Sequence, residues 1–160
     1  MSYSRLLYKN GVPELSIVMF SERDLIFRVP QQSILDFARG GFARQVWVLS
    51  AATAGQAEAL DFLTKILAAA RLNLGQDTLF VQVPDHAQIS ILPALKEKHG
   101  EFILVFGLSP SDIGLTADIP MYSPLPFYGS TFLFADALSR LEPDKALKSR
   151  LWQALQQMFL

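Results

Sequence analysis

The sequence contains no cysteine, and only two of its 160 residues are histidine. The lack of cysteine excludes disulfide bonds, thiolate nucleophiles and cysteine-ligated metals. His86 and His99 have no carboxylate or histidine at the spacing of a metal-binding motif. His86 is the only residue placed to serve as the base of a Ser–His–Asp triad, and no nucleophile elbow accompanies it. We therefore expect no metal, no cofactor and no catalytic triad.

Charge is also scarce. Only 18% of the residues are charged, the formal net charge is −1, and 51% are hydrophobic. A near-neutral chain has no long-range attraction for nucleic acid or for an anionic membrane. Its apolar residues either fill a core or form a surface for a protein partner. No run approaches a membrane span, and the first residues lack the apolar centre of a secretory signal. The sequence thus favours a cytoplasmic protein with no membrane association.

The hydrophobic pattern predicts one α/β domain over residues 1–160. Apolar strands are expected at 46–49, 78–83 and 102–106, with amphipathic helices between them. This alternation predicts a three-layer α/β/α sandwich around a mostly parallel sheet of four or five strands. Residues 1–44 form an N-terminal segment, either packed on or extending from the α/β core at 45–160.

Several further elements follow from local signals. A hairpin is expected from the strand-like runs 15–20 and 25–29. A short helix starts after Ser33, and Pro93 shortens a helix at 87–98. Near the end of the chain we expect a strand at 117–122 and then two helices. The last of these helices begins at Pro143 and buries Trp152 beside Leu151.

Ligands of open parallel sheets bind at the carboxyl ends of the strands, where three loops are expected. The first loop, 50–55, offers Ser50 and Thr53 and could hold a phosphate, although a simple turn is the commoner role for such a sequence. The second loop, 107–115, contains Asp112. This carboxylate is the best placed for chemistry, but a Ser-Pro-Ser-Asp string more often caps a helix.

The third loop, 121–129, is uncharged and rich in aromatic and apolar residues. Side chains of this kind form the core when buried, and they anchor a protein partner or stack on bases when exposed. We therefore identify this loop as the main candidate binding site. Its proposed partner-binding residues are Met121, Tyr122, Ser123, Pro124, Phe127 and Tyr128.

The string Met121-Tyr-Ser-Pro-Leu125 resembles the His-Pro-Ser-Pro-Leu loop of uracil-DNA glycosylases, which follows their last strand. The resemblance implies the glycosylase-like α/β fold. It places Met121 where those enzymes have a histidine that stabilises the transition state. It also places the loop Ser50–Thr53 where they have an aspartate that orients water. Both catalytic groups of the enzyme family are therefore missing.

The chain is also similar to the psi subunit of the bacterial DNA polymerase III clamp loader, a family with a catalytically empty version of this fold. The similarity rests on Ser123-Pro124, on Ala135–Leu138 and on Lys148-Ser-Arg-Leu-Trp152, and it extends in order of elements over residues 12–157. It implies that residues 1–30 correspond to the psi segment that engages the clamp-loader collar.

Two classes of function remain. The first is a non-catalytic protein-binding module, such as a psi-like accessory subunit of the replisome. The second is a divergent nucleic-acid enzyme of the glycosylase superfamily that uses Asp112 or His86. Near-neutral charge and empty catalytic positions favour the first class, with direct binding to nucleic acid the less favoured mode.

Overall fold

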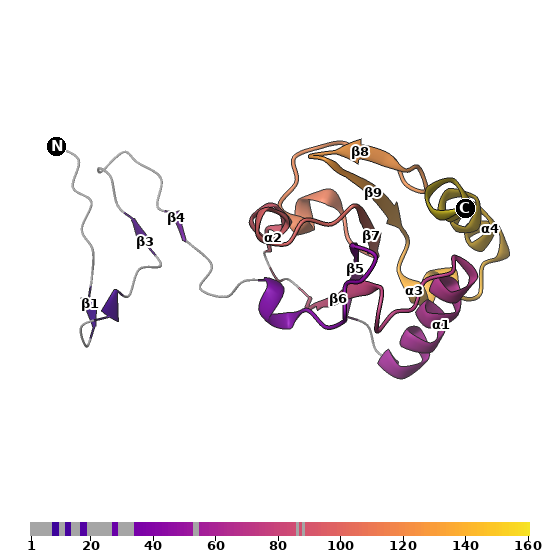
Figure 1. The fold of residues 1–160 in the computed structure, drawn as a ribbon, viewed down its shortest axis with the longest axis horizontal. Coiled ribbons are helices and arrows are strands. Elements are labelled where there is room, and N and C mark those ends of the chain that lie inside the picture. The colour runs from indigo at the N-terminus through magenta and orange to yellow at the C-terminus, as the bar shows by residue number, and fades with distance from the viewer. Residues whose placement is uncertain are drawn as a thin grey trace. The chain divides into compact units, whose positions relative to one another are not determined.

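The computed structural model describes residues 34–52, 55–85, 87 and 89–160, together with four short strands nearer the N-terminus (Figure 1). The chain divides into two units, Met1–Ser33 and Ile34–Leu160. In the first unit two antiparallel pairs form: β1 (Tyr8–Lys9) with β2 (Val12–Pro13), and β3 (Ile17–Val18) with β4 (Phe27–Arg28). The second pair confirms the predicted hairpin. That both units make one domain stays a prediction.

The second unit is built on a five-stranded sheet with the order β6-β5-β7-β9-β8. Its strands are β5 (Val46–Ala51), β6 (Thr78–Val83), β7 (Phe102–Phe106), β8 (Leu125–Phe127) and β9 (Ser130–Ala135). All neighbours pair in parallel except β8, which runs antiparallel to β9. The predicted α/β fold with a mostly parallel sheet is therefore confirmed.

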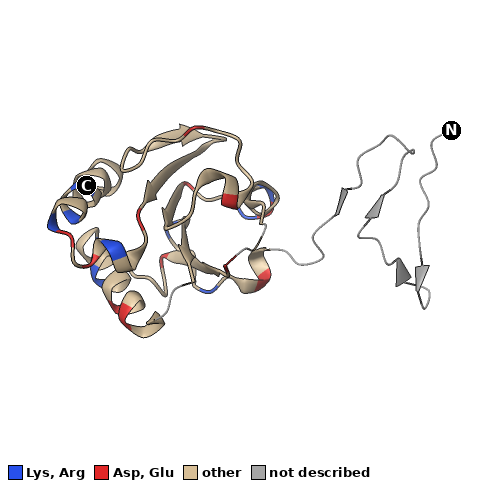
Figure 2. Ribbon diagram, turned by 180° about the vertical axis from the view of Figure 1, so that it is seen from behind, with Lys and Arg blue, Asp and Glu red and all other residues tan. Residues whose placement is uncertain are grey.

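No strand of this sheet carries a charged residue, and the charges lie on helices and loops (Figure 2). Side chains alternate along each strand between two buried apolar clusters. Trp47, Leu49 and Val105, for example, belong to one cluster, while Val48 and Leu104 belong to the other. This two-sided burial is the reason that the strands read as continuous apolar runs.

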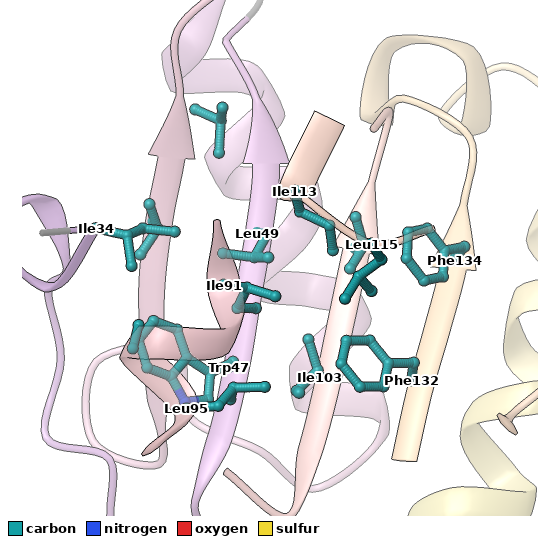
Figure 3. Close-up of a cluster of buried hydrophobic side chains, with 14 of the residues drawn as sticks. Ile34, Trp47, Leu49, Ile91, Leu95, Ile103, Ile113, Leu115, Phe132 and Phe134 are labelled. Carbon is teal, nitrogen blue, oxygen red and sulfur yellow. The ribbon is translucent and has the colours of Figure 1, made fainter. Parts of the chain in front are cut away.

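The two faces of the sheet are covered differently. One face is covered by three helices: α1 (Gln56–Ala69), α3 (Leu138–Leu141) and α4 (Lys145–Phe159). The other packs against α2 (Ile91–Glu97) and two 3₁₀ turns, η1 (Ile34–Phe37) and η2 (Pro110–Ile113) (Figure 3). Because α2 is the only α-helix on this second face within residues 34–160, the regular three-layer sandwich stays a prediction.

The segment that follows η1 closes the outer edge of β6. The backbone of Arg39 exchanges two hydrogen bonds with Phe80, of 2.9 and 2.7 Å. Gly40 has a φ of 129°, and a Cβ there would overlap the carbonyl oxygen of Thr78. Only glycine allows this close approach of two backbones. Gly40 thus lets the chain run along the edge of the sheet.

Two elements near the C-terminus differ from expectation. The predicted strand at 117–122 is wrong, because only Met121 forms a bridge, with Phe134. Pro120 has no N–H to donate, and Tyr122 adopts a left-handed φ of 58° that ends any extended run. The strand that pairs with β7 is β9, just beyond the loop 121–129, and it was not among the predicted strands. The sequence signal for it was the turn Tyr128-Gly129 before an alternating apolar run.

Helix boundaries also needed correction. The helix expected at 87–98 begins only at Ile91, and Pro93 lies in its first turn, where no N–H is required. The closing helix is confirmed as α4, but it begins at Lys145 and not at Pro143. Asp144 is its N-cap, and the Asp144 side chain accepts hydrogen bonds from the N–H groups of Ala146 and Leu147. Trp152 is only half-buried on α4, so the expectation of a fully buried Trp152 is wrong.

The fully buried tryptophan is Trp47, the second residue of β5. Its Nε1 donates a hydrogen bond of 3.2 Å to the carbonyl oxygen of Lys98, and its ring meets the edge of Phe42 at 6.0 Å between centroids. The indole lies directly on Gly100, where a Cβ would overlap its Cδ1 atom. Position 100 is thus closed to any larger residue while Trp47 is present.

We expect Gly100→Ala to lower the free energy of unfolding by about 1–3 kcal/mol, the usual cost of overpacking a filled core. In a Trp47→Leu background the same change should cost clearly less, because the overlapping indole is gone. Urea denaturation of the four proteins measures both costs. An equal cost in the two backgrounds would show that Gly100 is constrained by something other than Trp47.

Candidate functional site

The six residues proposed as a partner-binding site lie in two separate places. Met121 forms its bridge with Phe134, near the carboxyl end of β9, whereas Phe127 pairs with Ser130 at the start of that strand. The antiparallel strand β8 carries the chain back along the sheet between these points. The prediction that the whole loop lies at the carboxyl ends of the strands is therefore wrong for Phe127 and Tyr128.

The carboxyl-end group centres on Tyr122. Its hydroxyl donates a short hydrogen bond to Asp136 Oδ2 and accepts one of 3.2 Å from the Asp136 N–H. Asp136 also forms an ion pair of 3.1 Å with Arg140, and the Arg150 guanidinium lies over the Tyr122 ring, 4.8 Å from its centroid. A loop, the end of β9, α3 and α4 thus meet in one polar network.

This network changes the acidity of the tyrosine. Burial and, second, the hydrogen bond to Asp136 together raise the pKa of Tyr122 from 10.0 to about 12. The hydroxyl is therefore protonated at neutral pH and acts as a hydrogen-bond donor. Because its proton is held by Asp136, the phenol links the loop to the end of β9.

The neighbours of Tyr122 are more open. Met121 is 42% exposed, Ser123 is exposed and Pro124 is half-buried. The Ser-Pro-Leu string leads directly into β8. These residues present an uncharged surface beside the polar network.

The loop after β5 offers little chemistry among its described residues. Ser50 is only 5% exposed, and its hydroxyl donates a hydrogen bond of 3.3 Å to the carbonyl oxygen of Ala51. The other candidate in this loop, Thr53, lies outside the described residues. Close by, a Cβ on Gly107 would lie 3.0 Å from Ala137 and 3.3 Å from Ala51. Small residues thus bring the strand ends close together.

Asp112 serves as a helix cap. Its Oδ2 accepts hydrogen bonds from the Ser109 N–H at 2.7 Å and from the Ser109 hydroxyl at 2.9 Å. The Ser109 hydroxyl in turn accepts from the Asp112 N–H at 3.4 Å, which completes a capping box at η2. The backbone hydrogen bond and then the side-chain bond from Ser109 lower the pKa of Asp112. The structure therefore supports the capping alternative for this residue.

One of the two histidines lies in the part of the chain that the structure describes. His99 is exposed after the end of α2, whereas His86 lies outside the described residues. Within the described ranges, no three His, Asp or Glu side chains gather in a way that could hold a metal ion. Every helix in the described part of the chain is too short or too polar to span a lipid bilayer.

The second group, at the opposite end of the sheet, is the tip of the β8–β9 hairpin. Tyr128 and Gly129 form its two-residue turn, with φ values of 53° and 74°. A tyrosine in the left-handed region costs about 1–2 kcal/mol, and asparagine is the usual residue there. Tyr128 is nevertheless 66% exposed, so its ring gains little from burial.

A row of aromatic rings connects this tip with the core. Tyr128 meets Phe127 edge-on at 4.7 Å, Phe127 meets Phe132 at 6.1 Å, and Phe132 stacks on Phe134 at 6.3 Å. Phe132 and Phe134 are fully buried, and Phe127 is half-buried. Of these two proposed partner-binding residues, Phe127 is thus half-buried and supports the core, whereas Tyr128 projects.

Beside Tyr128 lies a cavity of 290 Å³ against α2. It is lined by Leu92, Leu95, Lys96, His99 and Tyr128. A second cavity, of 480 Å³, lies where β5 and β6 end. Its lining is Asp36, Phe37, Ala38, Arg39, Ala52, Gln56, Gln82 and Pro84.

Sequence reasoning missed Asp136, Arg140 and Arg150, as well as the residues from α2. Asp136 follows β9 directly, so recognising that strand would have placed a carboxylate at its carboxyl end. No sequence signal predicts that α2 lies beside the hairpin tip. That proximity depends on the order of the strands in the sheet and on the face that α2 covers.

Comparison with known proteins does not assign the chain to a family. No family model matches the sequence, and no curated protein matches it. The similarities to glycosylases and to psi subunits therefore rest on the short motifs given above.

The Tyr122 network makes a spectroscopic prediction. Tyr122 should lose its proton only near pH 12, because its neutral form is partly buried and hydrogen-bonded to Asp136. Since an unfolded tyrosine titrates near 10, the Tyr122 contribution to stability falls as pH rises from about 10 to 12. Absorbance titration of tyrosinate should show one late step that Tyr122→Phe removes. A late step that persists in this variant would contradict the assignment.

Proposed function

We propose that this protein is a non-catalytic protein-binding module. Its contact surface is the stretch from Pro120 to Ser130, which includes β8 and the turn of the β8–β9 hairpin. The observation that carries the proposal is the uncharged stretch from Pro120 to Ser130, much of which lies at the surface. Among the described residues, four large apolar side chains are exposed, and two of them, Met121 and Tyr128, lie on this stretch. Exposed aromatic and methionine side chains on a rigid element are typical protein anchors.

The state of the catalytic candidates supports a binding role. Asp112 is held in a capping box, and Ser50 is buried with its hydroxyl on a neighbouring carbonyl. Met121 can neither transfer a proton nor stabilise charge. A uracil-excising mechanism would need both functions at these positions, as the resemblance to glycosylases implies.

The resemblance to psi subunits extends the proposal to a particular setting. It suggests a cytoplasmic accessory subunit of the replisome whose partner belongs to the clamp loader. The Lys148–Trp152 motif lies on α4, and its half-buried tryptophan leaves part of the indole at the surface. Residues 1–30, which would engage the collar in this interpretation, lie outside the part of the chain whose side chains are described.

A second candidate function is a divergent nucleic-acid enzyme. The observation in its favour is the network of Tyr122, Asp136, Arg140 and Arg150 at the carboxyl end of β9. Clusters of titratable groups with a perturbed pKa at such a position are common in active sites. The same contacts also serve a structural role, since they join the loop, α3 and α4.

Capture of partners by the tagged full-length chain tests the binding function. We expect specific retention of a protein from a bacterial lysate and, in the psi-like case, coelution with purified DNA polymerase III clamp loader. The variant Met121→Ser should weaken retention, because it removes an exposed apolar contact without opening the core. Phe37→Ser, at another exposed apolar residue, is the matched control. Failure to retain any protein specifically would refute the binding function.

An excision assay separates the two candidate functions. We expect no uracil release from single-stranded DNA that contains uracil, because the positions of the glycosylase groups hold Met121 and the Ser50 loop. Turnover that disappears in Asp112→Asn or Tyr122→Phe, with the melting temperature unchanged, would establish the enzyme instead.

A further inference from the structure

The cavity beside Tyr128 forms a groove between α2 and the hairpin tip. The features of this groove point to one kind of ligand. Leu92 and Leu95 supply apolar lining, and Tyr128 supplies an aromatic wall. At 290 Å³ the groove is at the small end of the range for drug-sized ligands, about 300–1,000 Å³. It therefore suits one or two side chains of a peptide better than a cofactor.

The aromatic wall is held in place before any ligand binds. Tyr128 sits in a two-residue turn and leans on Phe127, which is fixed against the buried Phe132. Gly129, the next residue, passes close to His99, since a Cβ there would lie 3.8 Å from the His99 ring. A ring that is already ordered loses little conformational entropy on binding, which favours affinity.

The described residues give the groove charge of one sign. Among them, Lys96 is the only Lys, Arg, Asp or Glu in its lining, and it makes no ion pair with any of them. Lys98, two residues on, lies over the Phe42 ring at 5.1 Å and is absent from the lining. An apolar groove with one unpaired cation at its rim is complementary to an apolar side chain next to a carboxylate.

We propose that this groove binds a short acidic segment of a partner protein. One apolar side chain of the segment packs against Leu92, Leu95 and Tyr128, and an adjacent Asp or Glu pairs with Lys96. This inference rests on the proposed binding function and specifies the chemistry of the partner. A single cation does not suit a nucleic-acid backbone, which is neutralised by several Lys or Arg residues.

The test selects peptides from a random dodecapeptide library displayed on phage, with the tagged full-length chain as bait. We expect the selected peptides to share an apolar residue next to Asp or Glu. Their affinity is then measured by fluorescence anisotropy with synthetic, labelled copies. A selection that gives no binders, or only basic or uncharged ones, overturns the proposal.

Three variants locate the binding. Asparagine suits the left-handed turn, so the Tyr128→Asn protein should have a melting temperature at or above that of the parent. Its affinity for the acidic peptide should be lower by about tenfold or more. Lys96→Glu should also weaken binding of the acidic peptide. The Lys96→Glu protein should instead bind a variant of the peptide in which Lys replaces the Asp or Glu. Lys98→Glu makes the same change in net charge outside the groove. The affinity of this variant for the acidic peptide should stay within about twofold of that of the parent.

The remaining outcomes are equally decisive. Equal losses in Lys96→Glu and Lys98→Glu would indicate general charge attraction and overturn the groove assignment. A dimer in sedimentation that Tyr128→Asn dissociates would make a second copy the occupant, which also overturns it. If Tyr128→Asn still captures the partner of the parent chain, the binding function stands and only the groove proposal falls.

Discussion

The constraint on which this structure depends is an uncharged sheet that must be covered on both faces. None of the five strands contains a charged residue, and their side chains alternate between two buried clusters. Apolar area of this extent stabilises the fold only when both faces exclude water. Three α-helices satisfy that need on one face. On the other, α2 and the two 3₁₀ turns do so with less helix.

The same constraint explains where exposed apolar groups remain. The sheet ends at β8, a strand of three residues with Pro126 at its centre. A short edge strand with a proline resists pairing with another strand. Side chains, and not an open backbone edge, are therefore the surface that the hairpin offers to a partner. Met121 and Tyr128 project at opposite ends of this edge, so they mark two contact points and not one loop.

The polar network at Tyr122 shows how a site-like cluster arises from structural needs. A phenol that is partly buried requires a hydrogen-bond partner, and Asp136 provides it at the end of β9. The Asp136 carboxylate forms an ion pair with Arg140, and the Arg150 guanidinium lies over the Tyr122 ring. These contacts join elements that no local rule connects. The network thus stabilises the C-terminal part of the fold whether or not it also meets a ligand.

Much of the framework could be predicted from the sequence alone. Periodicity predicts the strands β5, β6 and β7 and the helices α1 and α4. The local sequence likewise favours the capping role of Asp112 as one alternative. All these features depend on residues that are close in the sequence. Tertiary structure decided what depends on distant contacts. The reversal at Tyr128-Gly129 moved Phe127 and Tyr128 to the opposite end of the sheet from Met121, because an antiparallel strand runs back along its neighbour. It also brought Tyr128 to α2 and Asp136 to Tyr122, pairings that no spacing in the sequence encodes.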